Sequence, residues 1–138
     1  AVTSDHGQVD VGTRARALDP RLAGEIEMAS GEARFRWLHA RSDVAGSVES
    51  LAALAGDIYG GEAWVATCDE IEAGGWFGGP LTPVVRARLG DVAVVPFEPV
   101  GYLAPSETAE PLLVCRHGSL TPEEMFVPLL GQRGRLAT

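Results

Sequence analysis

The clearest pattern along the chain is an alternation of apolar and charged residues between positions 24 and 41. Apolar residues occupy every second position on both halves of this segment, with charged residues between them: Ile26, Met28, Phe35 and Trp37 against Glu25, Glu27, Arg34 and Arg36. The Ser30-Gly31-Glu32 triplet interrupts the alternation. A period of two is typical of strands, so the segment predicts a β-hairpin that turns at 30–32 and has one face in water.

A helical pattern follows the hairpin. Five apolar residues fall on one stripe at helical spacing: Val44, Val48, Leu51, Ala55 and Ile58. Ser42 or Asp43 can cap the start of this helix, and Gly60-Gly61 can end it. The pattern therefore predicts one amphipathic helix between these caps.

Shorter elements fill the rest of the chain. Strands are expected at 2–4, 63–67, 91–95, 101–103, 112–115 and 126–130, and a loop is expected at 5–13. Capping signals predict short helices or turns at Asp19-Pro20, at Thr67 with Glu70, at Thr82-Pro83, and at Thr121-Pro122 with Glu124 closing a capping box. No internal repeat or low-complexity segment interrupts this series.

Composition narrows the possible functions. A length of 138 residues allows one compact domain, and no apolar run approaches the roughly 20 residues of a membrane span. The net charge of -8 argues against a nucleic-acid polymer as partner, and an acidic protein that handles phosphate esters normally needs a cation. All 11 basic residues are arginine, which excludes a lysine Schiff base and indicates, with the many Ala and Gly residues, a bacterial genome rich in G and C.

Several other residues are expected to have structural roles. Cys68 and Cys115 are too far apart for a zinc knuckle and are predicted to be buried free thiols. Trp37, Trp64 and Trp76 are predicted to be core or interface aromatics. The Trp76-Phe77-Gly78 segment has a second interpretation as the lining of a substrate cleft. His39, on the hairpin, is expected at the surface or in packing.

Two of the three histidines occur in the same setting. His6 and His117 each follow an apolar segment and precede a glycine, and the ends of strands are where open α/β sheets place their ligands. Glycine in the next position lets the backbone turn without blocking the site. Asp5 next to His6 provides a carboxylate oxygen and an imidazole nitrogen, a pair that zinc or manganese accepts. A loop aspartate beside a solvent-exposed histidine is the alternative interpretation.

Two longer motifs carry a family resemblance. The segment VTSDHG at 2–7 and the segment HGSLTPEEMFVPL at 117–129 resemble, in this order, signatures of the alkaline phosphatase superfamily. The second motif is similar to that of bacterial members of the nucleotide pyrophosphatase/phosphodiesterase type. The resemblance covers both ends of the chain and is less specific between them.

The resemblance implies a fold and a set of ligands. It implies an α/β protein, with residues 1–138 as the C-terminal segment of an alkaline-phosphatase-like catalytic domain, a three-layer α/β/α sandwich with a mixed sheet. Residues 24–104 would be a β-hairpin-plus-helix insert. Asp5 and His6 would bind one divalent ion, and His117 would bind a second. Both ions are expected to be zinc, with manganese as the alternative. No catalytic residue is assigned, because the Ser or Thr nucleophile and the other ligands would lie in the N-terminal portion of the polypeptide.

The function implied is hydrolysis of a small-molecule phosphate ester or nucleotide by the complete polypeptide, in the cytoplasm, without a membrane partner. The isolated chain is expected to be inactive. A metal-dependent phosphomutase or a sulfatase-like relative is an alternative, because these enzymes share the two histidine motifs. A non-catalytic binding module is an alternative from a different class, and it would be indifferent to zinc.

Overall fold

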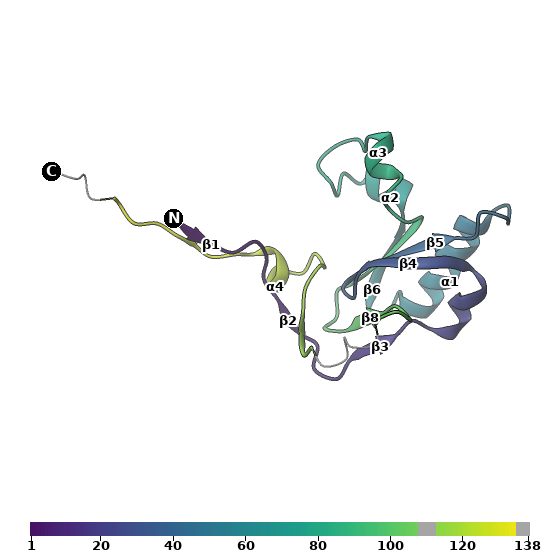
Figure 1. Ribbon diagram of the computed structural model, residues 1–138, viewed down its shortest axis with the longest axis horizontal. Coiled ribbons are helices and arrows are strands. Elements are labelled where there is room, and N and C mark those ends of the chain that lie inside the picture. The colour runs from purple at the N-terminus through teal and green to yellow at the C-terminus, as the bar shows by residue number, and fades with distance from the viewer. Residues whose placement is uncertain (108–112, 135–138) are drawn as a thin grey trace.

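The computed structural model describes residues 1–107 and 113–134. Figure 1 shows a rounded body, built from residues 14–107, and a thin arm that projects from it. The arm consists of residues 1–13 and 113–134, and the N-terminus lies toward its far end. The two predicted histidine motifs therefore belong to the arm, whereas the predicted hairpin and long helix belong to the body.

The body is built on a four-stranded antiparallel sheet. Its strands are β4 (Ile26–Glu32), β5 (Phe35–Ala40), β7 (Val92–Pro96) and β6 (Ala63–Thr67), in the order β4-β5-β7-β6. The predicted hairpin is present, but β4 runs on to Glu32, which pairs with Phe35, so the turn falls at positions 33–34. Gly31 continues the strand at a φ of 82°, a conformation that favours glycine.

The buried strand β7 separates two apolar clusters. Val92 and Val94 belong to a cluster with Leu51 and Ala55 of α1 (Ser47–Tyr59), whereas Ala93 and Val95 belong to a second cluster that includes Cys68 and Ile71 of α2 (Cys68–Ala73). Alternation of side chains along a strand explains this division, because successive residues point to opposite faces. The sheet is therefore packed on both faces.

Local capping signals placed the short elements correctly. Thr67 and Glu70 form the predicted capping box at the start of α2. Thr82 caps α3 (Pro83–Arg86), and Asp19 caps the 3-10 helix η1 (Pro20–Gly24). Strand β8 (Gly101–Leu103) has the predicted bounds and pairs in parallel with β3 (Ala15–Ala17). These signals act over a few residues, which is why the sequence is sufficient to find them.

The arm consists of two short strand pairs and one helical turn. Strand β1 (Val2–Thr3) pairs with β10 (Leu129–Leu130), and β2 (Val9–Asp10) pairs with β9 (Cys115–Arg116), both antiparallel. The helix α4 (Pro122–Met125) lies between β9 and β10, with Thr121 as its N-cap and Pro122 at its first position, as predicted. The last two predicted strands are shorter than 112–115 and 126–130, and position 112 lies outside the described residues.

Several predictions about burial are wrong. Arg34 and Arg36 do not lie on a wet face of the hairpin; both are fully buried, because backbone carbonyls and carboxylates surround their guanidinium groups. Met28, expected to pack, is exposed. Cys68 is a buried free thiol as predicted, and burial raises its pKa, but Cys115 is exposed. Trp37 is buried in the core as predicted, whereas Trp64 is exposed and contacts Phe97, so its alternative role in an interface stays a prediction.

The predicted α/β class is confirmed, because the chain combines helices with strands, and the strands form several small sheets. The four-stranded sheet is antiparallel, and β3 with β8 is the parallel pair among the described residues. A complete three-layer sandwich and the division at 24–104 stay predictions. Across residues 1–107 and 113–134, no helix combines the length and the apolar character required to cross a membrane.

Candidate functional site

The pairing of β2 with β9 brings the two histidine motifs together. Val9 lies opposite Arg116 in an antiparallel register, so the residues just before Val9 run beside those just after Arg116. As a result the rings of His6 and His117 stack, with centroids 3.7 Å apart and planes inclined by 16°. The two histidines come from opposite ends of the chain and meet at one point of the arm.

The route to this meeting differs from the predicted one. The sequence placed each histidine at the end of the strand that precedes it, and ligands of one two-metal site at such ends would require these two strands to lie side by side. Instead, β1, which precedes His6, pairs with β10, and β9, which precedes His117, pairs with the strand that follows His6. The predicted proximity of the histidines is confirmed, but an antiparallel pairing of short strands produces it.

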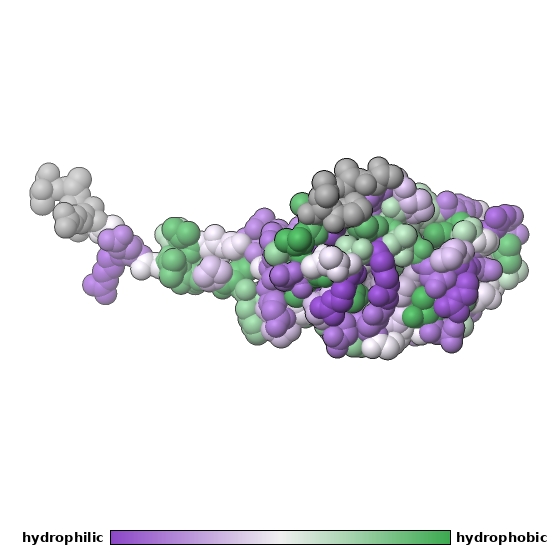
Figure 2. Space-filling model, turned by 90° about the horizontal axis from the view of Figure 1, so that it is seen from below, coloured by the Kyte–Doolittle hydropathy of each residue, from purple (hydrophilic) through white to green (hydrophobic). Residues whose placement is uncertain are grey.

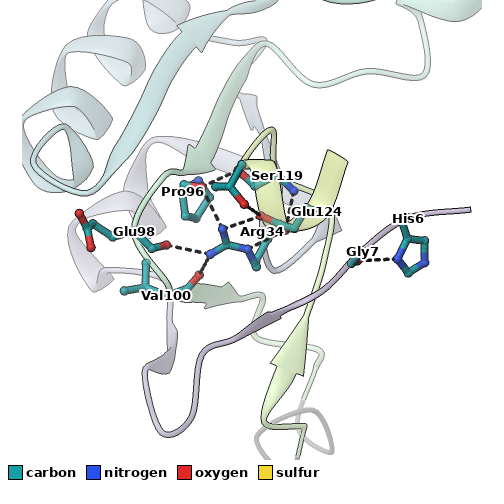
Figure 3. A network of polar contacts seen from close by, with 9 residues as sticks. His6, Gly7, Arg34, Pro96, Glu98, Val100, Ser119 and Glu124 are labelled. Atoms are coloured by element: carbon teal, nitrogen blue, oxygen red, sulfur yellow. Dashed lines mark hydrogen bonds and ion pairs between the residues drawn. The ribbon is translucent and has the colours of Figure 1, made fainter. Parts of the chain in front are cut away.

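His6 is held in a defined orientation. Its Nδ1 lies 2.8 Å from the carbonyl oxygen of Gly7 (Figure 3). A carbonyl oxygen can only accept, so Nδ1 is the donor in this contact, and in the neutral ring with this tautomer the lone pair is on Nε2. Histidines that bind metals commonly donate their second ring N–H to a carbonyl or carboxylate in this manner. The tautomer of His6 therefore suits a metal ligand.

Asp5 offers a second ligand group beside His6. The Oδ2 atom of Asp5 lies 3.7 Å from Nε2 of His6, and Oδ1 accepts a hydrogen bond of 3.1 Å from the backbone N–H of His6. The backbone N–H of Asp5 itself, and then the neighbouring His6, lower the pKa of the Asp5 carboxyl. Two donor atoms on one tetrahedral zinc, each about 2.1 Å from the ion, are ~3.5 Å apart. The spacing of Asp5 and His6 is close to this value.

These residues fit part of a metal site rather than a closed one. A zinc ion normally takes at least three protein ligands. Nowhere in the described ranges 1–107 and 113–134 do three or more His, Cys, Asp or Glu side chains form a group that could hold a metal. Asp5 and His6 supply one pair, and the stacked ring of His117 lies beside them.

Each histidine is followed by a glycine, and the two glycines are needed for different reasons. A Cβ on Gly7 would lie 1.9 Å from the carbonyl oxygen of Glu123, so the chain can pass α4 only without a side chain there. Gly118 instead has a φ of 121°, which L-residues rarely adopt. The sequence predicted a role for the glycine after each histidine, and the structure requires both: Gly7 for its close approach to α4 and Gly118 for its backbone conformation.

The carboxylate of Glu124, missed as a site residue, connects the arm to the body. We predicted that Glu124 would close a capping box with Thr121, but the Thr121 hydroxyl donates to the carboxylate and makes no bond to the helix backbone. Arg34 donates to both carboxylate oxygens, at 2.7 Å each, and the backbone N–H of Ser119 donates at 3.0 Å (Figure 3). The backbone carbonyl of Glu124 accepts from the N–H of Gly7 at 2.8 Å.

The buried Glu124 carboxyl is held in its ionised form. Burial by itself would raise the pKa of this group. The hydrogen bonds from Arg34, Thr121 and the backbone of Ser119, with the charge of Arg34, outweigh burial and hold the pKa below its ordinary value. No local pattern in the sequence signals this pair, because Arg34 and Glu124 lie in segments that meet only in the folded chain.

The remaining candidates lie outside the histidine pair. His39 lies on β5, and its Nε2 is 2.8 Å from the hydroxyl of Ser30 on β4, in agreement with a packing role. Phe77 and Gly78 line an apolar hollow of about 400 Å³ together with Leu81, Val85 and Leu89. A hollow is therefore present at the loop where a cleft was predicted, while its use for a substrate stays a prediction.

The arrangement of Asp5, His6 and His117 offers carboxylate and imidazole donor atoms of the kind that metal ions accept, but these three residues bring no hydroxyl nucleophile. Ser4, the nearest hydroxyl in the sequence, donates to the backbone carbonyl of His6 at 2.7 Å and is used in the turn. No protein-family model, no curated protein and no solved structure matches this chain.

Proposed function

We propose that this chain is the C-terminal part of a metal-dependent phosphate-ester hydrolase of the phosphodiesterase or nucleotide pyrophosphatase type. The observation that carries the proposal is the stacking of His6 on His117, at a centroid distance of 3.7 Å. Each histidine belongs to one of the two motifs that resemble the alkaline phosphatase superfamily. Their contact is what a shared site would require of motifs so far apart in the sequence.

In this proposal Asp5 and His6 bind one divalent ion and His117 binds a second, with zinc as the expected metal and manganese as the alternative. Two cations about 4 Å apart can hold the attacking and leaving oxygens of a displacement at phosphorus. The residues of this chain contribute ligand atoms and orientation. The carbonyl oxygen of Gly7 accepts a hydrogen bond from Nδ1–H of His6, which leaves Nε2 for the metal. The ionised carboxylate of Asp5 supplies a hard oxygen.

The remaining ligands and the nucleophile would come from the N-terminal portion of the same polypeptide. The exposed surface of the arm favours the view that another layer of protein packs against it. Val2, Phe126 and Leu129 are 67%, 80% and 77% exposed, and Figure 2 shows apolar residues along the arm. Apolar patches of this kind usually mark a contact surface. We propose that the strands of the arm enter the mixed sheet of a three-layer α/β/α sandwich, with residues 24–104 as its insert.

The proposal is tested by hydrolysis of a nitrophenyl phosphodiester. The complete polypeptide should turn over the substrate, lose activity after treatment with a chelator, and regain it with zinc or manganese. The isolated 138-residue chain should show no turnover under the same conditions, because it holds neither the nucleophile nor a closed ligand set. Zinc-dependent turnover by the isolated chain, or activity of the complete polypeptide that resists the chelator, would contradict the proposal.

A further inference from the structure

We propose that the buried ion pair between Arg34 and Glu124 is a positioning device that holds His6 against His117. The inference rests on the proposed function for the importance of these two histidines. Its test, however, reads the arrangement of the rings directly and needs no hydrolysis. Arg34 and Glu124 are positioning residues in this account, because their hydrogen bonds and ion pair go to other groups than the histidine rings.

Glu124 is bonded to both histidine segments at once. Its backbone carbonyl accepts from the N–H of Gly7, the residue that also fixes the ring of His6. Its Oε1 accepts from the N–H of Ser119, two positions after His117. A displacement of Glu124 would therefore move the two segments relative to each other.

Arg34 fixes Glu124 to the body of the protein. The guanidinium has five N–H donors, and all five are used: two go to the carboxylate of Glu124, and the others go to the carbonyls of Pro96, Glu98 and Val100. Arg34 sits in the turn of the β4–β5 hairpin, and two of these carbonyls lie in or beside β7 and β8. The pair thus fixes the position of the arm relative to the sheet of the body (Figure 3).

Stability alone does not account for such a pair. Both side chains are at most 1% exposed, and a buried ion pair commonly adds no more net stability than apolar residues of the same size. What it adds is a defined geometry, because a bidentate arginine–carboxylate contact has two parallel bonds and tolerates little rotation. This property is useful where two ligand-bearing segments must keep one arrangement.

The test uses NMR of the three histidines in the 138-residue chain, each assigned by single substitution. Stacked rings shift the signals of one another's ring protons, so His6 and His117 should show displaced signals, with His39 as an internal reference. The test variant is Glu124→Gln, which keeps the size of the side chain but removes the charge and one acceptor. The matched control is Glu107→Gln, which breaks the pair of Glu107 with the equally buried Arg36.

We expect Glu124→Gln to move the ring signals of His6 and His117 to the values of unstacked histidine, while those of His39 stay in place. Glu107→Gln should leave the stacking signature unchanged. Persistence of the signature in Glu124→Gln, or its loss in both variants, would overturn the proposal. If Glu124→Gln does not fold, Glu124→Asp decides, because it keeps the negative charge but shortens the side chain, so the two bonds from Arg34 cannot keep their present geometry. Loss of stacking in folded Glu124→Asp supports the proposal, and retained stacking overturns it.

Discussion

Glu124 combines full burial with a negative charge, and its surroundings set how the stability of the fold depends on pH. The pKa of its carboxyl lies below the ordinary value of 4.5, because hydrogen bonds and the charge of Arg34 outweigh the effect of burial. A carboxyl whose pKa is lower in the folded state than in the unfolded state stabilises the fold at pH values above the unfolded pKa. That stabilisation disappears as the pH falls through the lower, folded-state pKa.

The first prediction at this scale concerns the free energy of unfolding of Glu124→Gln. At pH 7 the variant should be less stable than the parent chain by about 3–5 kcal/mol, because it leaves the charge of Arg34 buried without a partner. The difference should shrink as the pH falls below about 4.5, where Glu124 of the unfolded parent chain gains a proton, and continue to shrink until the pH passes the lower pKa of the folded state. Urea unfolding between pH 7 and pH 3 provides the measurement. A difference that stays constant over this range would contradict the assignment.

Local sequence patterns pointed to some residues of the candidate site and missed others. Asp5, His6 and His117 were predicted because histidine next to glycine is a local pattern, and the structure brings both histidines together, while their role as metal ligands stays a prediction. Arg34 and Glu124 were missed because each has an ordinary local explanation, a hairpin position and a helix cap. Their partnership depends on how the arm packs on the body, which no short pattern records.

At the scale of elements, the start of α1 shows how tertiary contacts override local signals. We predicted a cap at Ser42 or Asp43, yet α1 begins at Ser47 with Gly46 as its N-cap. Ser42 donates to the carboxylate of Glu27 through both its backbone N–H and its hydroxyl, at 2.9 and 2.7 Å. Asp43 is bound by Arg41. Both potential caps are therefore engaged elsewhere, and the helix starts later than the sequence suggests.

This late start gives a prediction for the apolar stripe of the helix. Leu51 is fully buried, whereas Val44, on the same predicted stripe, lies before the helix and is 50% exposed. Leu51→Ala should lower the free energy of unfolding by about 2–5 kcal/mol through lost contacts and a cavity. Val44→Ala should change it by no more than about 0.5 kcal/mol. Chemical denaturation of the two variants measures both, and equal losses would show that the stripe continues to Val44.

At the scale of the whole molecule, the body and the arm are built differently. The body has two apolar clusters on a four-stranded sheet, and the apolar patterns of the sequence predict the strands and helices that form them. The arm has short strands with exposed apolar side chains, and the sequence predicted longer strands there. Strand length depends on partners as well as on composition, so patterns within 112–115 and 126–130 could not define these bounds.

The most direct test of the account is the effect of each histidine in the complete polypeptide. His6→Ala and His117→Ala should each lower zinc-dependent hydrolysis of a nitrophenyl phosphodiester by at least about 100- to 1000-fold, since each removes a proposed metal ligand. His39→Ala should stay within a few-fold of the parent rate, because His39 contacts Ser30 within the hairpin. Bound metal is counted in each variant, and folding is checked by circular dichroism. A His117→Ala variant that keeps both metals and a near-normal rate would contradict the account.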